Sequence, residues 1–202
     1  MNSKKDVLYK NNNSAQNDND FGFFQVSNKS DYGWIVNSLP AVVIVPVQID
    51  ERSDLSEAKD KTTIGLIQIF RKPIEKMGWE LPGGSLDEME KPWQTTKREL
   101  YEETGMETHE IEEIGQFYEA PGRMFFPHFV FIAKNPKYSV YHDELPQKRE
   151  QIRQFKFFSL ERVNNMIEQG DIISGPTLAG LGFLKQWLSK FSCGPYLDKI
   201  QQ

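Results

Sequence analysis

Residues 79–106 read WELPGGSLDEMEKPWQTTKRELYEETGM and contain the most informative pattern in the chain. The segment Pro92–Thr104 is predicted to be a helix, because proline suits the first helical position. Gly105 follows it and suits the left-handed residue that ends a helix. The helix is therefore bounded at both ends by residues that favour a sharp start and a sharp stop.

One face of this helix carries three glutamates. Residues three and four apart share a helix face, so Glu99, Glu102 and Glu103 are expected to point the same way. Carboxylates packed together repel one another, and a protein that keeps them close usually holds cations there. Mg²⁺ prefers hard oxygen ligands, keeps several waters and completes its shell with substrate phosphates. The pattern therefore predicts a Mg²⁺ site.

The loop before the helix adds two features. A pair between Glu90 in the loop and Arg98 in the helix would fix the loop to the helix. Gly83-Gly84 lets the backbone turn tightly and approach a ligand, so a carbonyl at Gly84 is a candidate metal ligand. The alternative is a solvated helix face with internal ion pairs. The fixed spacing from Gly84 to Glu103 disfavours that alternative, because so many identities seldom coincide by chance.

The rest of the chain alternates apolar segments with polar turns. The run Pro40–Ile49 is β-branched and almost wholly apolar, which is typical of a strand buried on both faces. The other predicted strands are Phe21–Val26, Tyr32–Asn37, Thr62–Arg71, Ile111–Tyr118, His128–Ala133 and Arg153–Phe158. A helix is expected from an N-cap at Ser159 to Gln169, and a last one over Pro176–Leu188 with leucines 178, 181, 184 and 188 on one stripe.

This order of elements favours an α/β domain with a mixed sheet. We expect three parts: an N-terminal extension with short strands (1–38), a catalytic domain (39–190) and a C-terminal tail (191–202). Residues 138–151 form a polar stretch that is expected to be a loop.

Charge and cysteine content narrow the function classes. The net charge is −5, so an anionic substrate would need positive charge from bound metal ions. Lys and Arg are scattered, which disfavours a nucleic-acid partner. The chain has one cysteine, Cys193, which excludes an intramolecular disulfide. With no apolar run of membrane-spanning length and no signal-peptide core, we expect a soluble, cytoplasmic protein.

The segment from Gly84 to Met106 resembles the signature of the Nudix hydrolase family, the Nudix box. The resemblance implies an α/β/α sandwich around a mixed sheet, Mg²⁺ or Mn²⁺ dependence, and hydrolysis of a nucleoside diphosphate linked to another group. Carried over by position, it implies metal ligation by Glu99, Glu102, Glu103 and the Gly84 carbonyl, with Glu90 and Arg98 as structural support. Two departures from the common pattern are Met89 for glycine and Thr95-Thr96 for Ala-Ala.

Features outside the box resemble the ADP-ribose pyrophosphatase and nucleoside diphosphate sugar hydrolase branch of this family. They are Gln68–Arg71 before the box, the ELPGG run at Glu80–Gly84, and a proline, Pro121, fifteen residues beyond Met106. The resemblance implies a small-molecule nucleotide substrate contacted by Arg71, Glu80 and Pro121. The acidic residues that usually follow the proline are missing, so another nucleotide sugar stays open as the substrate.

Hydrolysis also needs a general base for the attacking water. Glu99 or Glu102 is the candidate within the box, and Glu144 or Glu150 is the candidate in the 138–151 loop. Our prediction favours a loop glutamate. His128 is expected in a strand and is given no role. The aromatic residues Phe125, Phe126 and Phe129 are expected in the core, with base stacking as the alternative.

Other functions stay open at this level. A dinucleoside polyphosphate, a nucleoside triphosphate or an RNA 5′ end would use the same chemistry. A sensor that binds a nucleotide sugar without cutting it is a further alternative, which the complete set of glutamates disfavours. The branch resemblance also implies a homodimer, with residues 21–37 as the pairing element.

Overall fold

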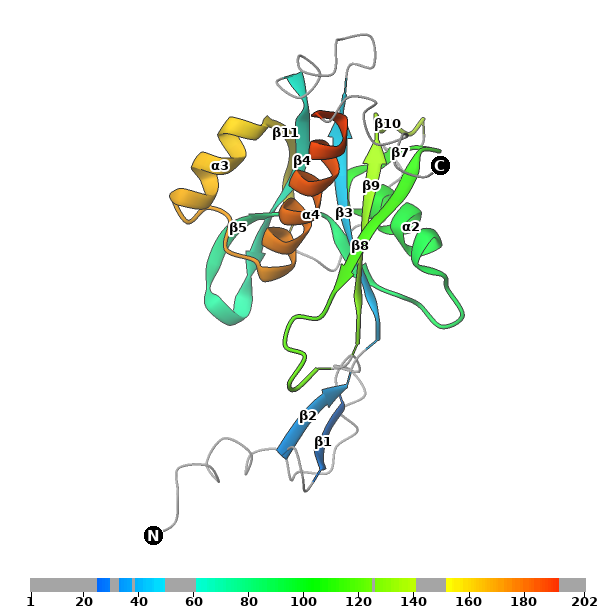
Figure 1. The fold of residues 1–202 in the computed structure, drawn as a ribbon, viewed down its shortest axis with the longest axis vertical. Coiled ribbons are helices and arrows are strands. Elements are labelled where there is room, and N and C mark those ends of the chain that lie inside the picture. The colour runs from blue at the N-terminus through cyan, green and yellow to red at the C-terminus, as the bar shows by residue number, and fades with distance from the viewer. Residues whose placement is uncertain are drawn as a thin grey trace, which may run out of the picture.

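The computed structural model describes residues 25–29, 33–37, 39–49, 61–124, 126–140 and 152–192. Its main body is a seven-stranded sheet in which β11, β4, β3, β9 and β8 lie in that order, with β5 paired to β4 and β6 paired to β3 (Figure 1). The strands are β3 Ala41–Gln48, β4 Thr63–Arg71, β5 Lys76–Glu80, β6 Gly83–Ser85, β8 Ile111–Phe117, β9 His128–Lys134 and β11 Ile152–Ser159. Strands β3 and β9 are parallel, and the other pairs are antiparallel. The predicted mixed sheet is confirmed.

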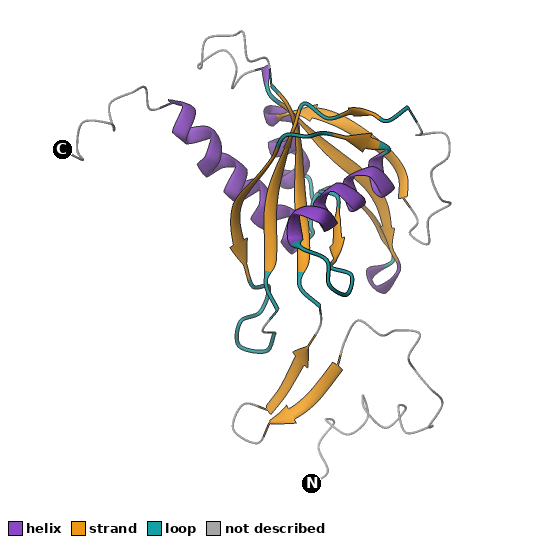
Figure 2. Cartoon of the chain, turned by 90° about the vertical axis from the view of Figure 1, so that its right-hand side faces the viewer, coloured by secondary structure: helices purple, strands orange, loops and turns teal. Residues whose placement is uncertain are grey.

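Helices cover both faces of this sheet (Figure 2). Helix α2, Pro92–Thr104, packs through Leu100 on one face, against Val42 and Ile44 of β3. Helices α3, Leu160–Glu168, and α4, Gly175–Ser192, pack on the other face, which includes Val43 and Val45 of the same strand. Because successive strand residues point to opposite faces, β3 supplies both cores and its apolar run is explained. The α/β/α sandwich is confirmed.

Several short elements were not predicted. The 3₁₀ turn η3, Lys72–Ile74, connects β4 to β5. Strands β7, Met106–Glu107, and β10, Lys137–Tyr138, form a two-stranded sheet of their own. Strand β10 falls at the start of the predicted 138–151 loop, and residues 141–151 lie outside the described residues.

The N-terminal extension contains a two-stranded antiparallel sheet. It consists of β1, Gln25–Lys29, and β2, Gly33–Asn37, with Lys29 opposite Gly33. The predicted first strand, Phe21–Val26, overlaps β1 at residues 25 and 26, and its residues 21–24 lie outside the described part. Strand β1 continues past the predicted end at Val26, because Asn28 and Lys29 pair with Trp34 and Gly33.

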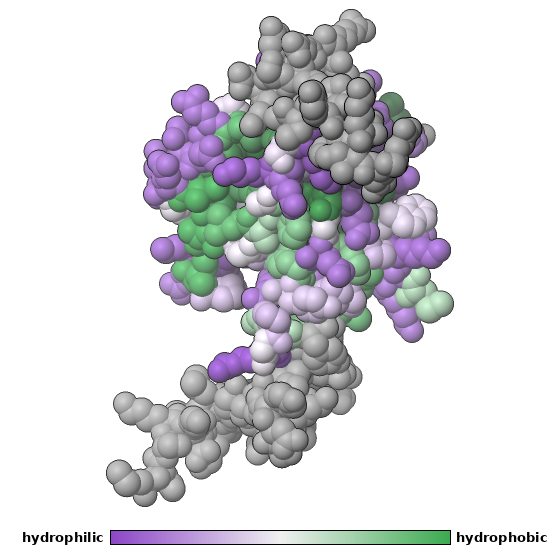
Figure 3. All heavy atoms as spheres, viewed as in Figure 1, coloured by the Kyte–Doolittle hydropathy of each residue, from purple (hydrophilic) through white to green (hydrophobic). Residues whose placement is uncertain are grey.

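The two C-terminal helices begin and end close to the predicted residues. The Ser159 hydroxyl caps α3 by accepting a hydrogen bond from the Arg162 amide at 3.2 Å, as expected. Helix α4 continues to Ser192, past the predicted boundary at 190. On its predicted stripe, Leu184 and Leu188 are buried, whereas Leu178 is 40% exposed and faces the groove between α3 and α4. Figure 3 shows apolar residues gathered on this face of the molecule.

Among the described helices, none has the length and apolar character needed to cross a membrane.

Candidate active site

Helix α2 is positioned by its two ends and its apolar face. Pro92 occupies the first turn, and Gly105 adopts a left-handed conformation with φ 71°. The Gly105 amide donates to the Tyr101 carbonyl at 2.8 Å and so closes the last turn. Leu100 is 1% exposed beneath the helix. The helix is therefore fixed with its glutamate face turned toward β6 and the loop that follows it.

The expected pair between Glu90 and Arg98 is present. Arg98 Nη2 donates to Glu90 Oε2 at 3.0 Å, and Arg98 Nε donates to Oε1 at 3.1 Å. The same Nη2 also donates to the Ser85 carbonyl at 3.1 Å. Hydrogen bonding by the guanidinium lowers the pKa of Glu90 to about 2, so the carboxylate is ionised at neutral pH. One arginine thus connects strand β6, the loop and the helix.

Thr95 adds a contact that depends on one of the departures from the common box pattern. Its hydroxyl donates to Glu90 Oε2 at 2.8 Å, whereas the neighbouring Thr96 hydroxyl donates to the Pro92 carbonyl within the helix. Both threonines are fully buried. An alanine at 95 would lack the donor, so this threonine gives the Glu90 carboxylate one more partner.

The structure brings Glu99 and Glu102 to the same nitrogen of Arg98. Nη1 lies 2.6 Å from Glu99 Oε1 and 3.4 Å from Glu102 Oε2. The repulsion between these two carboxylates is offset, because the guanidinium lies between them. Their convergence on one cationic atom indicates a place where positive charge is favoured.

Glu103 contacts strand β6. Its side chain is 8% exposed, and Oε2 accepts a hydrogen bond from the Gly83 amide at 2.8 Å. Gly84, the next residue, lies against Glu99, and a Cβ at Gly84 would collide with the Glu99 carboxylate. The Gly83-Gly84 pair is thus the place where the backbone of β6 comes close to the acidic helix face.

These groups match the donor preference of Mg²⁺. Carboxylate oxygens of Glu99, Glu102 and Glu103, together with a backbone carbonyl at Gly84, form a set of hard oxygen donors. In the described part of the chain, no three His, Cys, Asp or Glu side chains are grouped so that they could hold a metal ion. Arg98 engages Glu99 and Glu102, and Glu103 accepts from the Gly83 amide.

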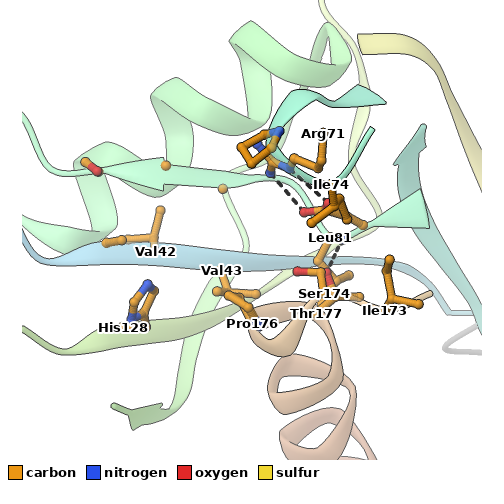
Figure 4. A pocket seen from close by; sticks show the side chains of 16 residues that line it. Val42, Val43, Arg71, Ile74, Leu81, His128, Ile173, Ser174, Pro176 and Thr177 are labelled. Carbon is orange, nitrogen blue, oxygen red and sulfur yellow. Dashed lines mark hydrogen bonds and ion pairs between the residues drawn. The ribbon is translucent and has the colours of Figure 1, made fainter. Parts of the chain in front are cut away.

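A cleft of about 450 Å³ borders the acidic helix face at Gly83–Ser85 (Figure 4). At one end, Arg71 forms a two-pronged ion pair with Glu80, with Nε–Oε1 and Nη2–Oε2 distances both 2.9 Å. The Arg71 side chain is 45% exposed and that of Glu80 only 10%. Ile74 and Ile173 lie at the same end of the cleft and are about half exposed. This end therefore offers an oriented cation and apolar side chains to a ligand.

The cleft floor is held by α4. The Thr177 hydroxyl, 1% exposed, accepts a hydrogen bond from the Leu81 amide at 3.0 Å, between β5 and β6. Thr177 and Pro176 both line the cleft. The apolar stripe of α4 predicted only core packing, so no part of the site was expected on this helix.

Among the described candidate residues, Arg71, Glu80 and Gly84 line this cleft, whereas Pro121 and the side chains of α2 do not. Pro121 lies in an exposed turn after β8 and is not among the lining residues. Glu144 and Glu150 lie outside the described residues. Of the three phenylalanines, Phe126 is buried at 6% and Phe129 is partly buried, while Phe125 is outside the described part.

His128 lines the cleft although sequence reasoning gave it no role. It is the first residue of β9 and pairs in register with Ala41, which itself lies opposite Ser85. A single histidine at the start of an apolar strand matches no sequence motif that would indicate a function. Only the register of β3 with both β6 and β9 places it beside the loop of the box.

The two buried threonines provide a matched test of the Glu90 anchor. Thr95→Ala removes a hydrogen bond to a carboxylate and is expected to cost about 1–2 kcal/mol of unfolding free energy. Thr96→Ala removes only a bond to a carbonyl of its own helix and gains helix propensity, so a change within about 0.5 kcal/mol is expected. Urea denaturation of both variants measures this, and equal losses would contradict a role for Thr95 in holding Glu90.

Comparisons with known proteins agree with this geometry. The NUDIX domain model matches residues 55–180. An ADP-ribose pyrophosphatase of Bacillus subtilis (strain 168) is 28% identical over 126 residues, which cover 62% of this chain and 67% of that protein. A methanol dehydrogenase activator of Bacillus methanolicus is 40% identical over 63 residues, 31% of this chain and 34% of the relative.

Two further matches are more distant or partial. A CMP-5'-(N-acetyl-N-hydroxy-3-aminopropyl)phosphonate hydrolase of Streptomyces rubellomurinus (strain ATCC 31215) is 27% identical, over 70% of this chain and 62% of that protein. The matched stretches thus span about two thirds or less of each curated relative. The crystal structure of an ADP compounds hydrolase superposes with a TM-score of 0.58 at 17% identity, covering 83% of this chain and 85% of that chain, which shows a shared fold.

The family model covers more than half of the chain and includes the whole acidic helix with its preceding loop. The chain therefore belongs to the Nudix hydrolase family.

Proposed function

We propose that the chain hydrolyses the diphosphate bond of a nucleoside diphosphate sugar similar to ADP-ribose, giving a nucleoside monophosphate and a sugar phosphate. The observation that carries this proposal is that Gly84, which lines the cleft, lies directly against the Glu99 carboxylate of the acidic helix face. A ligand lying along the cleft would have its diphosphate near these carboxylates and one organic group on either side.

The metal is proposed to be held by Glu99, Glu102, Glu103 and the Gly84 carbonyl. Mg²⁺, or Mn²⁺ in its place, supplies a bound water of lowered pKa and neutralises the charge that develops on the phosphates. Arg98 orients Glu99 and Glu102, which would share their oxygens between the guanidinium and such an ion. Because the chain is acidic overall, this bound charge also offsets repulsion of the anionic substrate.

Substrate binding is proposed to use the Arg71 end of the cleft for the nucleoside. The buried Glu80 carboxylate orients the Arg71 guanidinium, whose flat face can stack on a base. Ile74 and Ile173 provide apolar surface at the same end. Two relatives support a nucleotide linked to a second group, since their names describe an ADP-ribose pyrophosphatase and a hydrolase of a CMP-linked phosphonate. Pro121 remains a predicted contact from its place in the sequence.

The general base is proposed to be a glutamate of the 138–151 loop, Glu144 or Glu150, with Glu99 and Glu102 as the candidates on the helix. A base acts on the attacking water, so its loss lowers kcat rather than substrate affinity. We expect Glu144→Gln or Glu150→Gln to lower kcat at least about tenfold with an unchanged circular dichroism spectrum. Full kcat in both variants would assign the base to the helix.

We also propose a homodimer and a cytoplasmic location. An isolated two-stranded sheet is marginally stable alone, so β1 and β2 are expected to pack on a second copy. Light scattering on the full chain should give twice the mass of one chain, and removal of residues 1–38 should give a monomer. A chain with a single cysteine suits a reducing compartment.

The proposed reaction is tested by a substrate panel with MgCl₂. It holds ADP-ribose, ADP-glucose, GDP-mannose, UDP-glucose, diadenosine polyphosphates and deoxynucleoside triphosphates, with products measured as phosphate after phosphatase treatment. One diphosphate sugar is expected to be turned over preferentially, and EDTA is expected to abolish turnover. Glu103→Gln should lower kcat by about 100-fold or more, because it removes a charged oxygen donor.

The panel also separates the alternatives. Exposed Glu168 on α3 provides the matched control, and Glu168→Gln should retain wild-type rates. Turnover of triphosphates or dinucleotides alone would keep the metal site and overturn the substrate class. Tight binding of a nucleotide sugar without turnover would indicate a sensor instead.

A further inference from the structure

His128 is a buried, polar side chain that contacts two aromatic rings. It is 8% exposed, its ring stacks on Phe117 at a centroid distance of 4.9 Å, and Phe126 lies 5.6 Å away. Nδ1 is buried without a hydrogen-bond partner among the described residues. A buried polar atom of this kind lowers the stability of the fold, so a function explains it better than a contribution to folding.

The unpartnered nitrogen indicates which tautomer is present. A buried N–H without an acceptor is rarer and more costly than a buried acceptor without a donor. The proton of the neutral ring is therefore expected on Nε2, leaving Nδ1 as the unpaired acceptor. Burial lowers the pKa of His128, opposed by the nearby Glu119 carboxylate, so the ring is neutral at pH 7.

The Nε2 atom is not held by a protein hydrogen bond in the described part. Glu119 Oε1 lies 3.8 Å from Nε2, a distance longer than a hydrogen bond. Glu119 belongs to the turn that carries Pro121, and it biases the ring toward presenting an N–H. The side chain therefore has a donor available to a group that enters the cleft.

The position of His128 along the cleft defines what such a group would be. Figure 4 shows His128 near Val42, away from Arg71 and Ile74 at the other end. Register agrees, because His128 lies level with Ala41 and Ser85, five residues along the chain from Glu80. Gly84 and the adjacent Glu99 lie between the two ends. A ligand with its nucleoside at Arg71 would place its second group at His128.

We propose that His128 is a specificity-determining residue whose Nε2–H donates a hydrogen bond to an oxygen of the group beyond the diphosphate, such as a sugar hydroxyl. This inference rests on the proposed function, and it assigns the second end of the cleft. A polar ligand oxygen gains a prearranged donor there, while a group without oxygen would leave the donor unpaired.

The test compares His128→Phe with His128→Gln. Phenylalanine keeps the aromatic stack and removes both nitrogens, whereas glutamine restores an N–H donor. For the best diphosphate sugar of the panel, His128→Phe should raise KM about tenfold, as expected for one lost hydrogen bond, and His128→Gln should recover most of this loss. Inhibition by the corresponding nucleoside monophosphate, which lacks the second group, should be unchanged in both.

Thermal stability separates this role from a structural one. Replacing a buried unpaired polar ring by an apolar ring of similar shape is expected to leave Tm unchanged or raise it. A structural role for His128 predicts the opposite sign, with a lower Tm. Exposed His109 supplies the control, and His109→Gln should change neither KM nor Tm.

Each outcome bears on one proposal. An unchanged KM in His128→Phe, or an equal loss of affinity for the monophosphate and the full substrate, overturns the inference while the proposed function stands. If the wild-type chain hydrolyses no diphosphate sugar, the proposed function fails. In that case the increase in Tm caused by ADP-ribose is measured for wild type and for the same variants. An equal increase in wild type and His128→Phe overturns the inference independently.

Discussion

The ion pair between Glu90 and Arg98 is the constraint on which the site depends. Arg98 lies in the middle of α2, Glu90 lies in the loop, and the same guanidinium reaches the Ser85 carbonyl of β6. Three segments that are separated in sequence therefore meet at one side chain. The hydrogen bond from the Gly83 amide to Glu103 and the pairing of β6 with β3 act beside this contact to place Gly84 against Glu99. The charged pair is largely shielded from water, so its loss would leave an unpaired buried charge.

The same arginine offsets the repulsion between carboxylates on the acidic face of α2. Glu99 and Glu102 would repel each other if they faced solvent alone, and Arg98 Nη1 lies within ion-pair distance of both. Glu103 is satisfied separately by the Gly83 amide. The protein thus holds three carboxylates near residues that border the cleft, each with a partner in the chain.

The sequence predicted the parts of the fold that depend on local chemistry. Pro92 and Gly105 marked the ends of α2 correctly, and the apolar run of β3 indicated a strand with two buried faces. The pairing of Glu90 with Arg98 also followed from spacing. Strand β6 was not predicted, because Gly83–Ser85 has no strand propensity and is defined only by its pairing with β3. Strand β1 runs beyond its predicted end because Asn28 and Lys29, which have low strand propensity, pair with Trp34 and Gly33 of β2.

The cleft could be predicted only in part, because it is assembled by contacts between distant segments. Arg71 and Glu80 came from the motif, and the structure joins them in one ion pair. His128 and Thr177 reach the cleft through β9 and α4, and no pattern in either segment indicates this. Pro121 shows the opposite case, since its sequence position suggested contact whereas the described turn is exposed and outside the cleft lining.

The proposed function requires the glutamates of α2 to hold a divalent cation beside the cleft. Mn²⁺ binding to the full chain, followed by electron paramagnetic resonance of free Mn²⁺, measures this without substrate turnover. We expect Glu99→Gln to weaken Mn²⁺ binding about tenfold or more, while Glu168→Gln, with the same loss of charge on the other face of the sheet, leaves it unchanged. Equal Mn²⁺ affinity in wild type and Glu99→Gln would contradict a metal site on this helix.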